Sequence, residues 1–203
     1  MAINTRSRLV QTTLRLLQAH GYHGTGLNLI LSESGAPRGS LYFHFPGGKE
    51  QLALEAVRYG IEWATRDLEA SLKSAADPVD GVCAYIDAAA RLMRDSNFTF
   101  GCPVAPVILD SPESESPLWE ACRSAFKQWH GVLTDGLREA GATAERAKTL
   151  ATLIIASLEG ALLMSRSQRD TRALDIISRE LSQIVRGALP AKRTRAARKA
   201  RPR

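Results

Sequence analysis

The sequence has few cysteines, few aromatic residues and no long unbroken hydrophobic run. Its three cysteines, Cys83, Cys102 and Cys122, are odd in number and form no C-x-x-C pair, which argues against a disulfide framework and a zinc site. Apolar runs such as 150–156 end within about ten residues, whereas a bilayer needs roughly 20. Polar residues follow the early arginines, so no signal-peptide hydrophobic region forms. These absences predict a cytoplasmic protein with reduced thiols and no membrane partner.

Charge is distributed unevenly along the 203 residues. Residues 1–60 carry six Lys/Arg against three Asp/Glu, and residues 61–190 carry fourteen against eighteen. The last thirteen residues, 191–203, carry seven basic groups and no acid. A basic head and tail suit a polyanion such as nucleic acid. The tail also lacks apolar periodicity, and we expect it to be disordered in isolation.

Apolar residues recur at spacings of three and four along nearly the whole chain, and alternating β-branched runs are absent. The pattern predicts an all-α fold of about nine helices, with a core that a 44% hydrophobic composition can fill. Thr25 is expected to cap the second helix, Pro37 to begin the third and Asp77-Pro78 to begin the fifth. The expected helices are 5–19, 26–34, 37–43, 49–74, 78–95, 104–109, 118–140, 144–167 and 171–186.

Residues 25–49 carry the strongest functional signal, because they predict two short helices about a glycine turn. In a helix-turn-helix the second helix enters the major groove of DNA while the first crosses the backbone. Arg38 is the best candidate for contacting a guanine edge, and Gly39 lets the backbone approach closely. Side chains at the helix ends suit phosphates. The predicted DNA-binding residues are Thr25, Asn28, Pro37, Arg38, Gly39, Ser40, Tyr42, Phe43, His44 and Lys49. The alternative is an ordinary helical hairpin.

Several segments resemble the helix-turn-helix signature of the tetracycline-repressor (TetR) family: Thr25-Gly26-Leu27, Ser34-Gly35-Ala36, the run 38–45 and Lys49-Glu50. The run 35–50, together with Gly101-Cys102-Pro103-Val104, is most similar to the branch of LmrA/YxaF-type regulators. One departure is that three residues, 46–48, separate the final aromatic residue from Lys49, where most members have two. Lys49 is therefore a weaker phosphate candidate than Tyr42.

The resemblance implies a three-helix helix-turn-helix domain over 1–48 and a helical ligand-binding and dimerisation domain over 49–190, followed by the basic tail 191–203. It also implies a homodimer formed through the last two long helices. Ala156, Gly160 and Ala161 would suit close packing across a two-fold axis, although an internal helix contact would have the same pattern.

Aromatic and sulfur-containing side chains of the body are candidates for lining a ligand cavity, and the alternative for each is an ordinary place in the core. Cys102 has no neighbouring Lys, Arg or His to activate it, which favours a quiet buried thiol over a redox sensor. His20 and His23 are too isolated to predict a metal site, and no cofactor is expected. The predicted ligand-binding residues are Trp63, Tyr85, Met93, Phe98, Phe100, Cys102, Phe126, Trp129 and His130.

These observations predict a ligand-responsive transcriptional repressor. It would bind palindromic double-stranded operator DNA as a dimer and release it when a small apolar or aromatic effector shifts the helix at 49–74. The alternative is a sequence-indifferent nucleic-acid binder driven by the basic tail. An enzyme is disfavoured, because Gly48-Lys49 lacks the rest of a P-loop and no G-x-S-x-G motif occurs.

Overall fold

Helices make up nearly all of the computed structural model, which describes residues 4–110 and 116–190. Within these residues there is no strand, so the all-α prediction is confirmed. The predicted basic tail 191–203 lies outside the described residues. The helices are α1 (Thr5–His20), α2 (Leu27–Ser34), α3 (Arg38–His44), α4 (Gly48–Ser74), α5 (Pro78–Asp95), α6 (Ala105–Asp110), α7 (Pro117–Glu139), α8 (Ala144–Gln168) and α9 (Arg172–Ala188).

Four helices, α1, α5, α7 and α8, begin at a residue whose side chain caps a free backbone N–H group. Asp77 accepts a hydrogen bond from the Asp80 N–H at 3.0 Å, with Pro78 in the first turn, as the sequence predicts. The prediction that Thr25 caps α2 is wrong. Gly26 is the N-cap, and Thr25 is fully buried with its hydroxyl donating to the Gly21 carbonyl at 2.7 Å. Thr25 therefore stabilises the turn before α2 and does not cap the helix.

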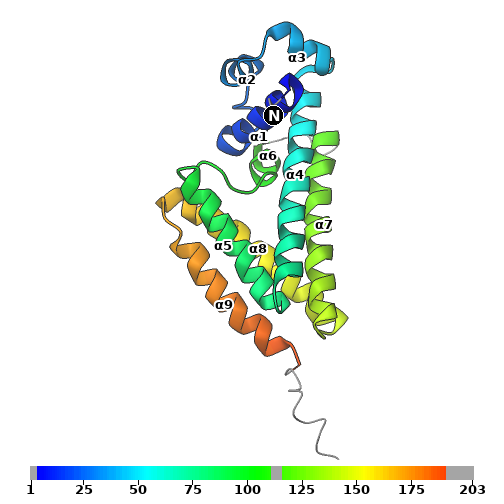
Figure 1. Cartoon of the computed structure of the whole chain (residues 1–203), viewed down its shortest axis with the longest axis vertical. Helices are drawn as coiled ribbons and strands as arrows, with labels where there is room; N and C mark the ends of the chain where they lie inside the picture. Colours follow the sequence, from blue (N-terminus) through cyan, green and yellow to red (C-terminus); the bar gives the residue numbers. More distant parts are fainter. Residues whose placement is uncertain (1–3, 111–115, 191–203) are drawn as a thin grey trace, which may run out of the picture.

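The long helix α4 joins the two ends of the molecule (Figure 1). Helices α1, α2 and α3 gather at its N-terminal end, and α7 runs beside it over most of its length. Helices α5, α8 and α9 complete the other end, where α5 and α8 each pack on α9. Because α4 packs on α1 as well as on α5 and α7, it belongs to both halves of the fold.

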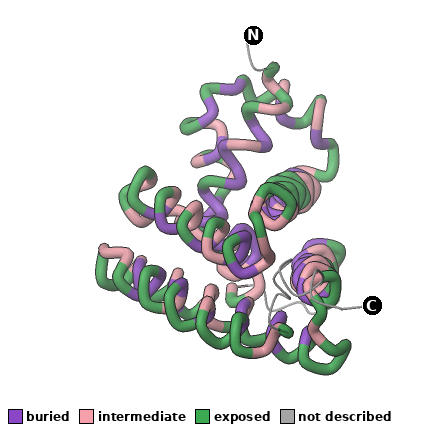
Figure 2. The backbone as a smooth tube through the Cα atoms, turned by 60° about the horizontal axis from the view of Figure 1, so that its bottom comes forward, coloured by how far each residue is buried: buried purple, intermediate pink, exposed green. Residues whose placement is uncertain are grey.

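Buried residues lie where helices face one another, and exposed residues cover the outward faces (Figure 2). In the head, Leu17, Ile30, Leu41 and Phe45 are completely buried and hold α1, α2 and α3 together. This apolar core fixes the position of α3, a helix of only seven residues that could not be stable alone.

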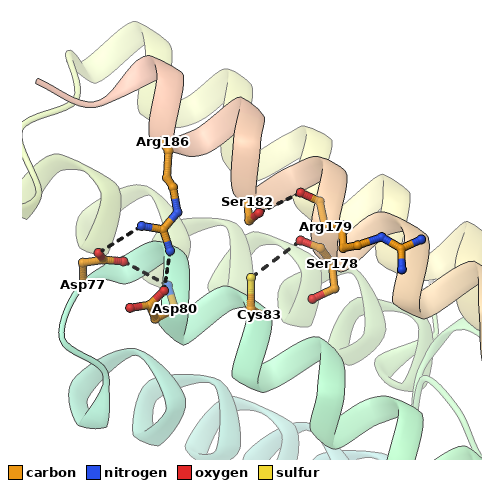
Figure 3. A network of polar contacts seen from close by, with 7 residues as sticks. All are labelled: Asp77, Asp80, Cys83, Ser178, Arg179, Ser182 and Arg186. Atoms are coloured by element: carbon orange, nitrogen blue, oxygen red, sulfur yellow. Dashed lines mark hydrogen bonds and ion pairs between the residues drawn. The ribbon is translucent and has the colours of Figure 1, made fainter. Parts of the chain in front are cut away.

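A polar cluster connects the end of α9 to the start of α5 (Figure 3). Arg186 donates to the Asp80 carboxylate at 2.5 Å and lies 3.7 Å from Asp77, the residue that caps α5. On the same two helices the Cys83 thiol lies 3.6 Å from the Ser178 carbonyl. Such partly exposed ion pairs contribute little free energy, so they define how α9 lies on α5 more than they stabilise the fold.

Helix α8 is unusually apolar for a helix with an open face. Among the described residues it is the one helix with the length and hydropathy to cross a membrane, with a mean hydropathy of 1.5 in its most apolar window. Counting unbroken runs in the sequence missed this property. Several large apolar side chains on α8 and α9 are exposed: Leu153, Leu163, Met164, Ile176 and Ile184. Such a helix is weak evidence for a membrane span, and an apolar face of this kind also suits a protein interface.

The crossing of α4 and α5 depends on a glycine, which gives a prediction about stability. A Cβ atom at Gly81 would lie 2.8 Å from the Leu72 Cα and 3.0 Å from the Ser71 carbonyl oxygen, both of which are backbone atoms. We expect Gly81→Ala to lower the free energy of unfolding by about 1–3 kcal/mol, because the helices must move apart. Urea denaturation at fixed protein concentration measures this loss.

Gly131→Ala is the matched control, since Gly131 lies within α7 and a Cβ atom there has no neighbour within 4 Å. This variant should be stabilised by about 0.5–1 kcal/mol, the usual helical preference for alanine over glycine. Equal effects of the two substitutions would contradict the close α4–α5 crossing.

Candidate DNA-binding surface and ligand cavity

Helix α3 has one buried face and one exposed face, and this division creates the candidate DNA-binding surface. Leu41, like Phe45 directly after the helix, is completely buried, whereas Tyr42 is 47% exposed and Phe43 is 81% exposed. Phe43 contacts only the edge of the His44 ring among described aromatic partners, at 5.0 Å between centroids. The expectation that Phe45 points inward and Tyr42 outward agrees with this burial.

Arg38 begins α3 and connects it to α2. Its guanidinium donates to the Asn28 side-chain oxygen at 2.6 Å, and both residues are exposed. A guanidinium has five N–H donors, so this bond leaves donors for another partner. A Cβ atom at Gly39 would meet no atom within 4 Å, so nothing in this chain requires a glycine there. The missing side chain would instead allow a bound partner such as DNA to approach the backbone closely.

The structure brings nine of the ten predicted DNA-binding residues to the surface or close to it. Exposed residues are Asn28, Pro37, Arg38, Gly39, Tyr42 and Phe43, and partly buried residues are Ser40, His44 and Lys49. Thr25 is the exception. Its side chain is buried and its hydroxyl is already donated, so it is removed from the set of side chains that could contact a phosphate.

Lys49 faces back toward the chain. Its ammonium lies 4.2 Å from the centroid of the Tyr22 ring, which is a favourable cation–π distance. Burial lowers the pKa of Lys49, and the nearby Asp110 carboxylate partly opposes that change. The extra residue between Phe45 and Lys49, noted in the sequence, thus accompanies a lysine that already has partners.

A cavity of about 160 Å³ lies in the body between α4, α5, α7, α8 and the loop at 101–103. Its lining is mostly apolar. Four of the nine predicted ligand-binding residues line it: Trp63, Tyr85, Cys102 and Trp129. Trp129 is held in place by its indole N–H, which donates to the Thr65 hydroxyl at 2.9 Å.

The other five predicted residues do not line the cavity: Met93, Phe98, Phe100, Phe126 and His130. Met93 is a core residue with 1% exposure, and Phe126 packs edge-on against Trp129. Phe98 follows the end of α5 with a positive φ of 60°, beneath the Arg169 guanidinium. Phe100 belongs to the same turn, since its N–H donates to the Ser96 hydroxyl, and the His130 ring lies 3.1 Å from the Lys148 carbonyl oxygen.

Two carboxylic acids that the sequence prediction missed also line the cavity. Asp67 comes from α4 and Glu159 from α8. The Cys102 thiol and Glu159 influence each other's ionisation, and burial raises the pKa of both groups. A signal for Glu159 was present, because it is the one ionisable residue in the stretch 149–165.

Direct hydrogen bonds connect the cavity wall and α8 to the end of α1. The buried Gln18 amide donates to the Gly101 carbonyl at 2.7 Å, and Gly101 lines the cavity. Arg166 of α8 donates to the Gln18 carbonyl at 2.8 Å and to the Ala19 carbonyl at 2.6 Å. These carbonyls belong to the last turn of α1, where no helical N–H satisfies them. Neither contact could be predicted from the sequence.

Within residues 4–110 and 116–190, no group of three or more His, Cys, Asp or Glu side chains is arranged to hold a metal ion.

Comparison with known proteins identifies the family. Residues 9–56 match the tetR family of bacterial regulatory proteins, and residues 78–180 match the C-terminal domain of LmrA/YxaF-like transcriptional regulators. The HTH-type transcriptional regulator LmrA of Bacillus subtilis is 36% identical over 183 residues, which are 90% of this chain and 97% of that protein. This chain belongs to the TetR family.

Solved structures of TetR-family proteins have the same fold. A TetR regulator from Chloroflexus aurantiacus superimposes with a TM-score of 0.75 at 26% identity, over 91% of this chain and 96% of that one. A cysteine mutant of the TetR-family regulator CifR, solved in complex with 26-bp double-strand operator DNA, has a TM-score of 0.77 at 20% identity, over 94% of this chain and 98% of that one. The TetR resemblance and the LmrA/YxaF-like branch indicated by the sequence are confirmed.

The cysteines of this TetR-family protein should differ sharply in reactivity. Cys102 and Cys122 are buried, and burial raises the pKa of Cys122 to about 12, so both thiols are protonated and shielded at neutral pH. Cys83 is partly exposed. We expect iodoacetamide at pH 7.5 to alkylate Cys83 on the order of tenfold faster than the other two, as measured by peptide mass spectrometry.

Urea-unfolded protein provides the control, because all three thiols should then react at similar rates. Preferential labelling of Cys102 in the folded protein would contradict a quiet buried thiol and favour a reactive sensor.

Proposed function

We propose that this TetR-family protein is a ligand-responsive repressor that binds a palindromic operator as a homodimer and leaves it when a small aromatic molecule enters the cavity. The observation that carries the proposal is the two-faced α3, in which Leu41 is buried while Arg38, Tyr42 and Phe43 are exposed. A helix anchored on one face and open on the other has the form needed to enter a major groove. The operator-bound relative CifR supports the same use of this fold.

The dimer proposal rests on the outer faces of α8 and α9. Leu163 of α8 is 67% exposed and Ile176 of α9 is 50% exposed, and both lie on helices that also pack on each other. Pairing these faces across a two-fold axis would bury them as a four-helix interface and would explain why α8 is so apolar. In this proposal residues 1–48 bind DNA, residues 49–190 bind ligand and dimerise, and the protein acts in the cytoplasm.

The structural change that releases the operator would pass from the cavity to the DNA-binding helices by two routes. Helix α4 contributes Trp63, Ala64 and Asp67 to the cavity wall and packs on α1 nearer its start. The second route is polar: the Gln18 side chain of α1 donates to the Gly101 carbonyl in the loop at 101–103, and Arg166 of α8 donates to the Gln18 carbonyl in the last turn of α1. A ligand that rearranges either wall changes the position of α1 and hence of α3 relative to its two-fold mate.

The first experiment selects bound fragments of genomic DNA with the purified full-length protein and maps the footprint. Arg38→Ala should weaken binding to the preferred site by about 1–3 kcal/mol, or roughly 5–150-fold, and relax the preference at one position of each half-site, because a bidentate contact with guanine is lost. Fluorescence anisotropy at constant salt measures the affinity. Arg91→Ala is the control, since it removes the same charge from an exposed position on α5.

An unchanged footprint and affinity for Arg38→Ala would remove this residue from the DNA-binding surface. Deleting residues 191–203 separates the proposal from the tail-driven alternative. A repressor retains its specific footprint after the deletion, whereas a sequence-indifferent binder loses nearly all affinity. A protein that is monomeric in sedimentation analysis would contradict the dimer.

A second prediction concerns Arg166. Arg166→Gln should leave operator affinity within a few-fold, because no DNA-facing residue changes. It should weaken release by an aromatic compound active on the unaltered protein by about 5–150-fold, since a coupling energy is typically 1–3 kcal/mol. Arg146→Gln, at an exposed position near the start of α8, is the control. Normal release by Arg166→Gln would exclude this contact as a coupling route.

A further inference from the structure

The charges in the cavity wall all have one sign. Among the residues that line it, the ionisable acids are Asp67 and Glu159, and there is no Lys, Arg or His. Within the described residues neither carboxylate forms an ion pair with a cation of this chain. An acid in an apolar wall without a cationic partner is unfavourable when ionised, which leaves the cavity short of positive charge.

Both acids line the same cavity as Tyr85. Burial raises the pKa of Tyr85 strongly, and the nearby Cys102, Asp67 and Glu159 groups raise it further. The two carboxylates come from different helices, α4 and α8, and both disfavour a negative charge on this phenol. Burial likewise raises the pKa of Glu159. A positive charge next to Tyr85 would lower the raised pKa values of Tyr85 and Glu159, whereas a negative charge there would raise them further.

The aromatic lining favours the same kind of ligand. Trp63 and Trp129 line the cavity with Tyr85, so three electron-rich rings come from three different helices, α4, α5 and α7. A cation over such rings is attracted by their quadrupoles, most strongly where water is excluded. The rest of the wall is apolar and includes Val82, Leu133 and Ile154. Its volume of about 160 Å³ is close to that of an engineered cavity of ~150 Å³ that holds benzene.

From this combination we propose that the cavity binds a small aromatic cation, with its ring among the tryptophans and its positive nitrogen beside Glu159, Asp67 and Tyr85. The proposal rests on the proposed function, because it names the class of effector for the same site. It also narrows the expectation of an apolar or aromatic molecule to one that carries a positive charge. A neutral aromatic compound would leave both carboxylates without a counter-charge.

Two probes of the same shape test the charge directly. Benzyltrimethylammonium carries a permanent positive charge, and neopentylbenzene replaces its nitrogen by carbon. Binding can be followed by tryptophan fluorescence, because two of the three tryptophans line the cavity, and Trp119→Phe removes the signal of the third. We expect the cation to bind the full-length protein about tenfold more tightly than its neutral counterpart, or better. Equal or weaker binding of the cation overturns the proposal, as does a failure of both probes to bind.

Variants then assign the charge to its residues. Glu159→Gln keeps the shape of the side chain and should weaken benzyltrimethylammonium about tenfold while leaving neopentylbenzene unchanged. Asp67→Asn should act in the same direction and provides an independent test if Glu159→Gln does not fold. Glu145→Gln is the matched control, because Glu145 is an exposed glutamate on the same helix. Unchanged cation binding by both cavity variants overturns the proposal.

Operator release, measured separately, distinguishes this proposal from the proposed function. If the cation binds in a Glu159-dependent manner but leaves the DNA complex intact, the ligand class stands and effector-driven release fails. If the neutral probe binds as well as the cation and releases the DNA, the repressor function stands and the cationic class is wrong.

Discussion

The close approach of three segments at Gly60 constrains the rest of the fold. A Cβ atom at this position of α4 would lie 2.8 Å from a methyl carbon of Leu14 on α1 and 2.8 Å from the Pro103 Cβ in the loop of the cavity wall. Leu14 belongs to the head, and Pro103 lines the cavity. Because no space separates them at this crossing, a movement of the cavity wall must be absorbed by α1 or by α4. The head is thereby packed directly on the wall of the cavity.

The cavity is where the fold departs from the rules that govern the remaining core. Elsewhere the buried positions of α8 hold residues such as Leu150, Ala151 and Ile154, which gain free energy by leaving water. Glu159 gains nothing of this kind, since among the described residues its desolvation is offset only by the Cys102 thiol. A buried acid that lowers local stability in this way is typical of a binding site, and its negative charge agrees with the proposed cationic ligand.

The helices could be predicted from the sequence because local signals mark them, such as Asp77-Pro78 at the start of α5 and Gly35 after α2. The sequence was less informative about the cavity. Periodicity identifies which face of a helix is buried, but not whether that face meets a side chain or an empty space, so Met93 and Phe126 were indistinguishable from Trp129. The prediction that Thr25 caps α2 was wrong for a related reason, since its hydroxyl donates to a carbonyl within the turn before α2. Contacts such as Arg166 with α1 join residues almost 150 positions apart and leave no local pattern.

Release, as proposed, depends on the free energy that couples the cavity to the DNA-binding helices. A ligand can shift an equilibrium only by the difference between its affinities for the two states, and a small cavity limits that difference. A coupling of about 1–3 kcal/mol in each subunit corresponds to roughly 5–150-fold in DNA affinity. In the proposed dimer the two copies of α3 bind one operator, so rearrangement in both subunits multiplies the two factors. Moderate coupling through Gln18, Arg166 and α4 is then sufficient to release the operator. Because linkage is reciprocal, bound DNA must weaken the affinity for the ligand by the same factor.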